Sequence, residues 1–247
     1  MLLSETQKKE ILVKAKDWFR KSVMESHLRN AKKLKKASEF NINPFTATYL
    51  ANFLTGDASP ESIAKALIYP RILGTSINTT FGGAIQNFTN DVLGTFSSTT
   101  LGIDIEYEDQ QDGRKKYCQI KSGPNTINKD DVETIHQHFK AVKNLARTNN
   151  LALQVNDMVV GIVYGERSEI SQHYKNLESK HDYIVLVGRE FWEKLTGDNE
   201  FYDDLIAVID EVAEESDFSE ELDSIIKDLS NDQKVIELSN MANKESK

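Results

Sequence analysis

The chain has 247 residues, of which 39% are hydrophobic and 28% charged, with only 4 prolines and 12 glycines. This composition excludes a disordered, collagen-like or low-complexity protein, and the length allows one large domain with extensions. The longest apolar stretch, residues 158–164, is far shorter than the roughly 20 residues that cross a membrane. The amino terminus lacks a secretory signal pattern, and a single cysteine, Cys118, excludes an internal disulfide, so a cytoplasmic protein is expected.

The net charge of −9 is unevenly distributed along the chain. Residues 1–40, the basic head, carry a net charge of +6, whereas residues 198–247, the acidic tail, carry −12. Acidic proteins are in general poor partners for nucleic acids, because phosphate binding depends on Lys and Arg. A basic head nevertheless leaves one side available to a polyanion, although solvated helix faces would give the same charge pattern.

Helices are expected over the first ninety residues. Apolar residues recur at helical spacing among the lysines of the basic head, which predicts amphipathic helices. Asn43-Pro44 and Ser59-Pro60 each place a capping residue before a proline, so two more helices should begin there, the second ending near Pro70. A helix predicted over residues 77–93 contains Gly82-Gly83, which implies close packing, since each helical glycine costs about 1 kcal/mol relative to alanine.

The central part of the chain alternates between strand and helix patterns. The expected elements are strands at residues 101–107, 115–121, 158–164 and 183–187, with an amphipathic helix over 129–147. Asp112-Gly113, between the first two strands, is typical of a two-residue hairpin turn. Together with the flanking helices, this order predicts an α/β fold with a mixed central sheet, helices on both faces and helical extensions at both ends.

The hairpin can place polar groups together. With a two-residue turn at Asp112-Gly113, Asp104 lies opposite Lys121 and Glu106 opposite Gln119. Because side chains alternate along a strand, all four polar side chains then project from one face. A turn one residue longer would transfer Asp104 to the apolar face, so the arrangement depends on the register.

A carboxylate, an amide and an ammonium group at one end of a hairpin suit metal-assisted hydrolysis of a phosphodiester. Mg²⁺ prefers oxygen ligands and is often held by only one or two carboxylates. Asp104, the Gln119 amide oxygen and the Ile120 carbonyl could supply such a partial site, with Lys121 beside the phosphate to orient water and offset charge. The same residues could instead form the exposed polar face of an amphipathic hairpin.

These residues also carry a family resemblance. Gly-Ile-Asp104, a hairpin and then Gln119-Ile-Lys121-Ser-Gly resemble the catalytic core of the PD-(D/E)xK nuclease superfamily, in particular type II restriction endonucleases. The wider pattern at residues 77–82, 99–104 and 117–130 is similar to enzymes that cleave palindromes with a GGNCC core. Gln119 departs from the acidic residue of the family motif, which implies weaker metal binding before DNA arrives.

The resemblance implies a Mg²⁺-dependent homodimer that hydrolyses double-stranded DNA at a short palindrome, each subunit cutting one strand and leaving 5′-phosphate ends. By the same resemblance, Asp104, Gln119 and Lys121 would be catalytic, and Asp104, Gln119 and Ile120 would bind the metal. Some members take a third ligand from the preceding helix, which here offers Gln86, Asn87 or Asp91.

DNA bases should be read by loops beside the catalytic edge, and the basic head is then expected to contact the DNA backbone. The candidates for base reading are Ser122, Asn125, Asn128, Lys129, Arg167 and Ser168. Lys and Arg side chains match the major-groove acceptors of guanine, and each good bidentate pair contributes about 1–3 kcal/mol of discrimination.

The predicted domains are an N-terminal helical region with the basic arm (1–70), a catalytic core (71–197) and an acidic C-terminal helical region (198–247). Two other functions remain open: a DNA repair or recombination nuclease of the same fold, and a non-catalytic DNA-binding module. A preference for branched DNA would favour the first, and unchanged behaviour of Asp104→Ala would favour the second. His136 and His138, two residues apart on a helix, are expected at the surface and not as ligands.

Overall fold

The structure is a computed structural model that describes residues 3–109, 112–215 and 218–243. It contains two compact units, which we call the sheet unit (Met1–Trp18 and Ala84–Glu211) and the helical unit (Phe19–Gly83 and Val212–Lys247). Each unit combines stretches that are distant in the sequence, and the functional division into 1–70, 71–197 and 198–247 stays a prediction. No described helix combines the length and the apolar character needed to cross a membrane.

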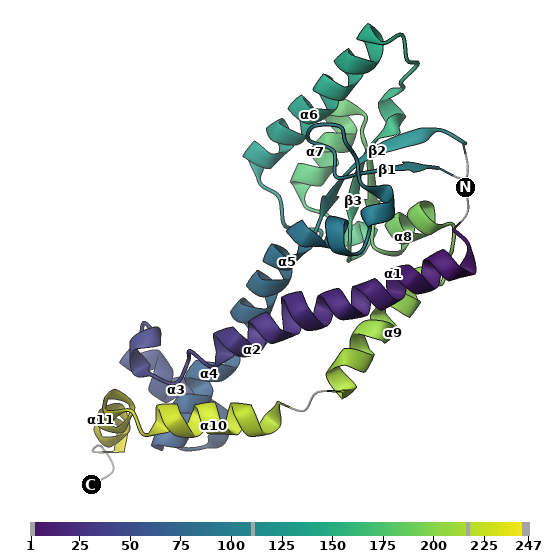
Figure 1. Cartoon of the computed structure of the whole chain (residues 1–247). Coiled ribbons are helices and arrows are strands. Elements are labelled where there is room, and N and C mark those ends of the chain that lie inside the picture. Colours follow the sequence, from purple (N-terminus) through teal and green to yellow (C-terminus); the bar gives the residue numbers. More distant parts are fainter. Residues whose placement is uncertain (1–2, 110–111, 216–217, 244–247) are drawn as a thin grey trace. The chain divides into compact units, whose positions relative to one another are not determined.

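The strands and α-helices alternate in the centre of the chain (Figure 1). Their bounds are α1 Glu5–Trp18, α2 Glu25–Ala31, α3 Pro44–Thr55, α4 Pro60–Pro70, α5 Ile77–Asp91, β1 Ile105–Glu108, β2 Lys115–Lys121, α6 Lys129–Thr148, β3 Met158–Ile162, α7 Gln172–His181, β4 Ile184–Val187, α8 Arg189–Thr196, α9 Phe201–Glu214, α10 Ser219–Ser230 and α11 Gln233–Ala242.

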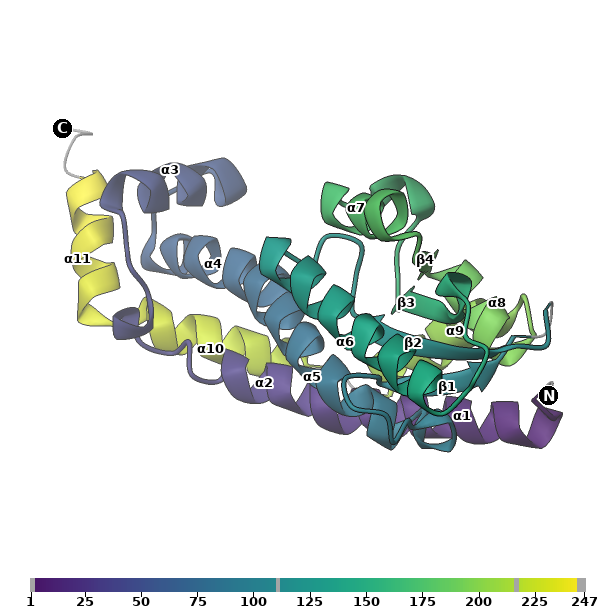
Figure 2. The same cartoon turned by 90° about the horizontal axis from the view of Figure 1, so that it is seen from above.

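The described strands form one mixed sheet in the order β1-β2-β3-β4. β1 is antiparallel to β2, whereas β2, β3 and β4 are parallel to their neighbours. Parallel neighbours need long crossover connections, and α6 and α7 provide them. Both helices cover the same face, where their apolar stripes join a core with alternate residues of β3 and β4 (Figures 1 and 2).

Aromatic residues close the opposite face of the sheet. A Cβ atom at Gly161 in β3 would lie 2.4 Å from the Phe191 ring of α8, so this close approach requires glycine. Next to it, the Phe88 ring of α5 contacts Trp18 of α1 and Trp192 of α8 edge-on, with centroid distances of 4.8 and 5.9 Å. The mixed sheet with helices on both faces confirms the predicted fold class.

The register of the β1–β2 hairpin differs from the predicted one. Glu106 lies opposite Tyr117, two residues away from the predicted partner Gln119. Ile105 lies opposite Cys118, so Asp104, the residue before it, lies beside Gln119, and the predicted pairing of Asp104 with Lys121 is also wrong.

The reason is the length of the connection. The Asp109 N–H donates to the Arg114 carbonyl at 3.0 Å, so the loop is two residues longer than the predicted turn at Asp112-Gly113. A shift by an even number of residues leaves every side chain on its original face. The four polar residues of the prediction, Asp104, Glu106, Gln119 and Lys121, therefore still share one face. Ile105 and Cys118 on the other face are fully buried.

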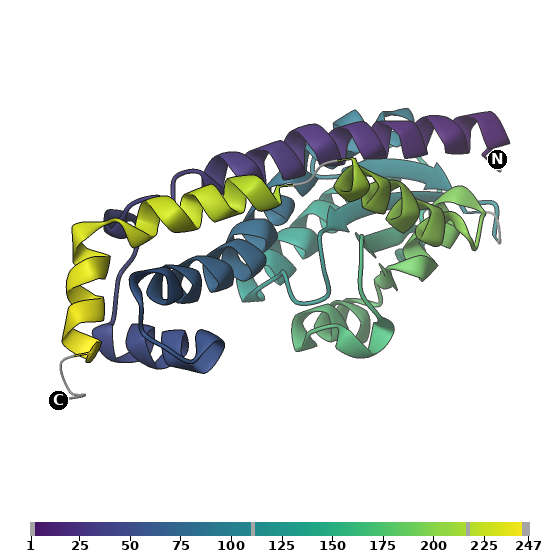
Figure 3. The same ribbon diagram turned by 90° about the horizontal axis from the view of Figure 1, so that it is seen from below.

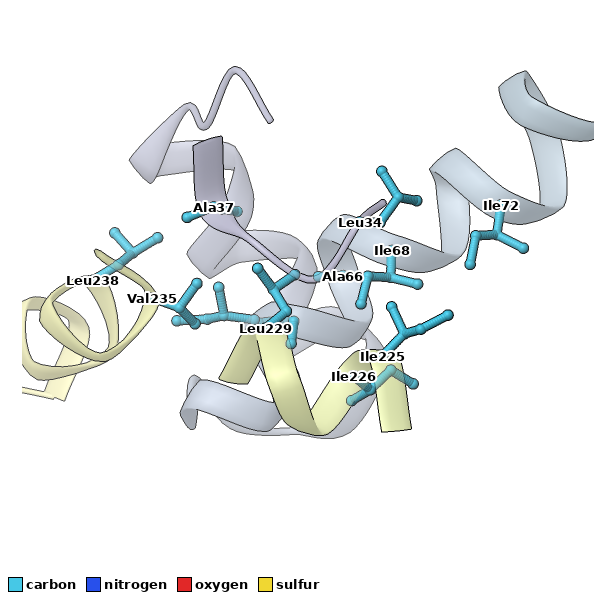
Figure 4. Packing of buried hydrophobic residues seen from close by; sticks show 14 of the residues in the cluster. Leu34, Ala37, Ala66, Ile68, Ile72, Ile225, Ile226, Leu229, Val235 and Leu238 are labelled. Carbon is cyan, nitrogen blue, oxygen red and sulfur yellow. The ribbon is translucent and has the colours of Figure 1, made fainter. Parts of the chain in front are cut away.

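The helical unit has its own core. Ile225, Ile226 and Leu229 of α10 and Val235 and Leu238 of α11 pack with apolar residues of α4 and of the segments around it (Figure 4). The predicted starts of α3 and α4 are confirmed by their caps. The Asn43 side chain accepts the Phe45 N–H at 3.0 Å, and the Ser59 hydroxyl accepts the Ser62 N–H at 3.3 Å.

The second of these helices, α4, ends at Pro70, as predicted, but the backbone beyond it stays helical. Pro70 keeps helical angles (φ −62°, ψ −31°), and a π-helical segment at Arg71–Ser76 leads directly into α5. The α-helical pattern therefore changes to a π-helical one directly after the proline, and the sequence pattern did not predict this continuation. The close packing expected at Gly82-Gly83 is absent among the described residues, because a Cβ atom at either position would meet none of their atoms within 4 Å.

Lys and Arg residues of the basic head form ion pairs with Asp and Glu residues of the acidic tail. In the sheet unit, Lys8 Nζ lies 2.7 Å from Asp198 Oδ2 and Lys16 Nζ lies 2.6 Å from Glu211 Oε2. α1 and α9 accordingly run next to each other (Figures 1 and 3). In the helical unit, Arg20 pairs with Glu215 and Lys35 with Asp228. The charge asymmetry of the sequence is thus partly neutralised within each unit.

Candidate active site

The predicted catalytic residues lie at one edge of the sheet. Because β1 runs opposite to β2, the residue before β1 lies beside the end of β2. Asp104 directly precedes β1, and Lys121 is the last residue of β2. This is also the edge at which the parallel strands β2, β3 and β4 end, and open α/β sheets bind ligands outside the carboxyl ends of their strands.

The carboxylate of Asp104 is held against β2. Its Oδ2 accepts the Ile120 N–H at 2.6 Å, and the Asp104 N–H donates to the Cys118 carbonyl at 3.0 Å. Removal of water raises the pKa of Asp104, although the Ile120 N–H, Lys121 and His138 act in the opposite direction. The residue is nevertheless exposed, and Oδ1 has no hydrogen-bond partner among the described residues. One carboxylate oxygen is fixed and the other is open to a ligand.

Gln119 is 4% exposed and its amide is held at the nitrogen end. Nε2 lies 2.7 Å from the Gly102 carbonyl oxygen and 2.8 Å from His138 Nδ1. These contacts use both hydrogens of the amide nitrogen. Within the described part of the chain, Oε1 makes no hydrogen bond, so it remains available to a cation.

Lys121 and Glu106 complete the polar face of the hairpin in different ways. Lys121 is half-buried, has no ion-pair partner in the described ranges and lies close enough to Asp104 to favour its charged form. Glu106 accepts hydrogen bonds from Ser98 and Thr100 and pairs with Lys115. Glu106 therefore stabilises the hairpin, whereas Lys121 is free to meet an anion.

The candidate base-reading residues lie on the connections that follow β2 and β3 and at the start of α6. The two connections touch, because the Ser171 N–H donates to the Pro124 carbonyl at 2.9 Å and a Cβ at Gly123 would overlap the Tyr164 ring. Four of the six candidates have no hydrogen-bond or ion-pair partner among the described residues, namely Ser122, Asn125, Lys129 and Ser168.

The other two candidates have partners within the protein. Asn128 Oδ1 accepts the N–H groups of Asp130 and Asp131 at 2.7 and 3.0 Å and so caps α6. The Arg167 guanidinium donates to the Val185 carbonyl at 2.5 Å and pairs with Glu178. Each could reach a base only with the donors that these contacts leave unused.

The oxygen donors fit a hard divalent cation such as Mg²⁺. Asp104 offers a carboxylate and Gln119 a carbonyl oxygen without a partner, next to the main-chain carbonyl of Ile120. No group of three or more His, Cys, Asp or Glu residues converges in the described parts of the chain. A metal ion here would therefore have a single acidic ligand. Asn87 and Asp91 are exposed on α5 without a described contact to Asp104, and the Gln86 side chain lies outside the described residues.

Sequence reasoning missed His138. The surface position expected for it is wrong, since the ring is half-buried and lies against Gln119. The sequence did contain a signal, because His138 is on the same face of α6 as the buried Ile135, Phe139 and Val142. His136 points elsewhere: its Nδ1 lies 2.9 Å from the Tyr183 hydroxyl.

One family model matches this sequence. It is described as type II restriction endonuclease EcoO109I, and the match covers residues 15–217. The matched region includes the β1–β2 hairpin, both crossover helices and every candidate site residue. A search of the curated proteins found no match.

Proposed function

Because the chain belongs to the family of type II restriction endonuclease EcoO109I, we propose that it cleaves double-stranded DNA at a short palindrome with Mg²⁺. The products would carry 5′-phosphate ends, and the palindrome would contain a GGNCC core. Asp104, Gln119 and Lys121 are the proposed catalytic residues. Asp104, the Gln119 amide oxygen and the Ile120 carbonyl would hold the metal ion, which when bound would offset negative charge on the phosphate.

The chain's own groups have separate tasks in this proposal. Asp104 keeps one oxygen on the Ile120 N–H and presents the other outward. Lys121 would lie beside the scissile phosphate, where its ammonium group orients the attacking water and stabilises charge that develops in the transition state. Among the described residues, Lys121 forms no ion pair that would have to break before it meets the phosphate.

The main support for the proposal is that two side-chain oxygens at one edge of the sheet are available to a ligand. Asp104 Oδ1 and Gln119 Oε1 both lack a described partner, while the rest of each side chain is fixed by hydrogen bonds. A solvated polar hairpin face would not require a 4% exposed amide held at both of its hydrogens. The buried and oriented amide therefore argues against a hairpin that is only a non-catalytic scaffold.

Sequence specificity is proposed to come from the two connections beside this edge. Ser122, Asn125, Asn128 and Lys129 precede or begin α6, and Arg167 and Ser168 follow β3. Lys129 is exposed and has no described ion-pair partner, so its ammonium group suits a guanine acceptor. In the basic head, Lys9 and Lys14 are exposed on α1 and are proposed to contact backbone phosphates.

A homodimer is part of the proposal, because a palindrome has one scissile bond in each strand and the described part of the chain offers one such site. The exposed face of α3 supports a contact with a second copy. Phe45, Tyr49 and Phe53 are 85%, 66% and 77% exposed, with Leu50 and Leu54 beside them. α3 contains no charged residue, which argues against DNA as the occupant, and interface cores are depleted in charge and rich in aromatic residues.

End sequencing tests this function. Full-length protein incubated with Mg²⁺ and DNA of known sequence should release discrete fragments, whose ends give the recognition site and the cut positions together. Asp104→Asn should bind the same DNA without cutting it. A smear, or intact DNA from several sources, would contradict a site-specific enzyme, and a preference for branched DNA would favour a repair or recombination nuclease.

A further inference from the structure

Gln119 poses an orientation problem that a carboxylate would not. The two ends of an amide have almost the same shape, but only the oxygen can bind a cation. At 4% exposure, solvent cannot fix which end faces the metal site. Neighbouring groups must therefore choose the orientation, and the choice decides whether the site has its second side-chain oxygen.

Two acceptors meet the nitrogen end. The Gly102 carbonyl can only accept a hydrogen bond, so the amide nitrogen, 2.7 Å away, must be the end that faces it. The second amide hydrogen points to His138 Nδ1 at 2.8 Å, which accepts it when the ring carries its hydrogen on Nε2. If the amide were flipped, Gln119 Oε1 would face the Gly102 carbonyl oxygen, and two hydrogen-bond acceptors would meet.

The imidazole is itself held in place from two sides. A Cβ atom on Gly102 would lie only 2.5 Å from His138 Cγ, so the ring rests directly on the main chain of a glycine with φ +79°. On α6, the neighbouring residues Ile135, Phe139 and Val142 anchor the helix face in the core. Helix packing thus fixes the position from which Nδ1 reaches Gln119.

We propose that His138 is a positioning residue that, together with the Gly102 carbonyl, holds the Gln119 amide so that Oε1 faces the metal site. This inference rests on the proposed function, because it assigns His138 to the oxygen donors of that site. His138 touches neither the metal ion nor the DNA in this assignment. Its effect is transmitted through one hydrogen bond to Gln119 Nε2.

Two substitutions at one position separate orientation from packing. His138→Asn retains an acceptor oxygen near the place of Nδ1, whereas His138→Leu fills the space without an acceptor. Loss of such an outer contact typically costs about 10- to 100-fold in metal affinity or activity. We therefore expect His138→Leu to raise the half-saturating Mg²⁺ concentration for cleavage by about tenfold or more, with His138→Asn recovering most of the loss. His136→Leu, on the same helix but against Tyr183, is the matched control and should leave the Mg²⁺ dependence unchanged.

The Gln119→Glu background provides the second test. A carboxylate has two equivalent ends, so no neighbour has to select one of them. His138→Leu should therefore raise the Mg²⁺ requirement less in this background than in the wild type, although one carboxylate oxygen then faces the Gly102 carbonyl. An equal rise in both backgrounds would mean that His138 acts only through packing and would overturn the proposal.

A third measurement does not depend on cleavage. In the full-length ¹⁵N-labelled protein, the side-chain amide hydrogens of Gln119 should exchange slowly with solvent, and His138→Leu, but not His136→Leu, should speed this exchange. Unchanged exchange would overturn the positioning role. If exchange responds as expected but neither wild type nor any variant cuts DNA, the orienting contact exists and the proposed nuclease function is the part that fails.

Discussion

Asp157 is a fully buried carboxylate that fixes the start of β3. Arg114 Nε donates to it at 2.8 Å, and Lys116, which is 1% exposed, lies 3.3 Å away. The Gln154 N–H contributes a third contact at 2.7 Å. Burial alone would raise the pKa of Asp157, but these hydrogen bonds outweigh it and hold the pKa below its ordinary value.

Asp157→Asn should therefore lower the free energy of unfolding at pH 7 by about 3 kcal/mol, because it leaves Lys116 buried without its full counter-charge. A carboxyl with a lowered folded-state pKa stabilises the fold above its unfolded pKa, and this stabilisation is lost as the pH falls through the folded value. The difference between wild type and variant should consequently shrink below the ordinary value of 3.8. Urea unfolding at several pH values measures it. Asp112→Asn, at the more exposed partner of Lys116, is the control and should cost less.

Gly102 and Gly82 form a second matched pair of residues. Gly102 has φ +79° and no room for a Cβ, so Gly102→Ala should destabilise the fold by about 1–3 kcal/mol and displace the His138 ring. Gly82 lies in α5, where a Cβ would meet no atom of the described residues within 4 Å, so Gly82→Ala should stabilise the fold by up to about 1 kcal/mol. Thermal unfolding of both variants checks the signs, and a stabilised Gly102→Ala protein would contradict the described geometry.

At the scale of elements, local signals in the sequence predicted where helices and strands form. Non-local contacts determined how the strands pair. The caps Asn43 and Ser59 correctly located two helix starts, because a cap involves only the next three residues. The hairpin register was missed, since the bond from Asp109 to Arg114 closes a longer loop than Asp112-Gly113 suggests.

The error in the register did not change which face of the hairpin carries the candidate site residues, and the reason is physical. The register shift is even, so the side chains of Asp104, Gln119 and Lys121 stayed on the predicted face. The contact between Gln119 and His138 joins a strand to a helix 19 residues later, and no periodicity within either element reports it. Continuation of the helix through Pro70 likewise depends on a π-helical segment for which the residue pattern gave no sign.

The pairing of α1 with α9 is open to a charge-reversal test. Lys16 and Glu211 are 23% and 55% exposed, so their ion pair contributes less than about 1 kcal/mol. Glu211→Lys should lower stability by a similar amount at low salt, and adding Lys16→Glu should restore it. Denaturant unfolding at low and high salt measures the effect. Equal stabilities for the single and double variants at low salt would show that the pair does not form.

At the scale of the whole molecule, the exposed face of α3 predicts the oligomeric state. Phe45→Glu together with Phe53→Glu places charge in the middle of the proposed contact, so the protein should change from dimer to monomer in sedimentation experiments. Val13→Glu, at a 63% exposed apolar residue of α1, is the control and should remain dimeric. A wild-type monomer at micromolar concentration, with or without DNA, would refute this contact.

The central claim is that Asp104, Gln119 and Lys121 form one catalytic site, and two lysines of β2 test it most directly. Lys121 lies at the proposed site, whereas Lys115, at the other end of the same strand, pairs with Glu106. The measurement is the single-turnover cleavage rate at saturating Mg²⁺ and DNA. We expect Lys121→Ala to lose at least about 100-fold, the usual scale for removing one transition-state contact, while Lys115→Ala stays near wild type. Comparable rates for the two variants would contradict the claim.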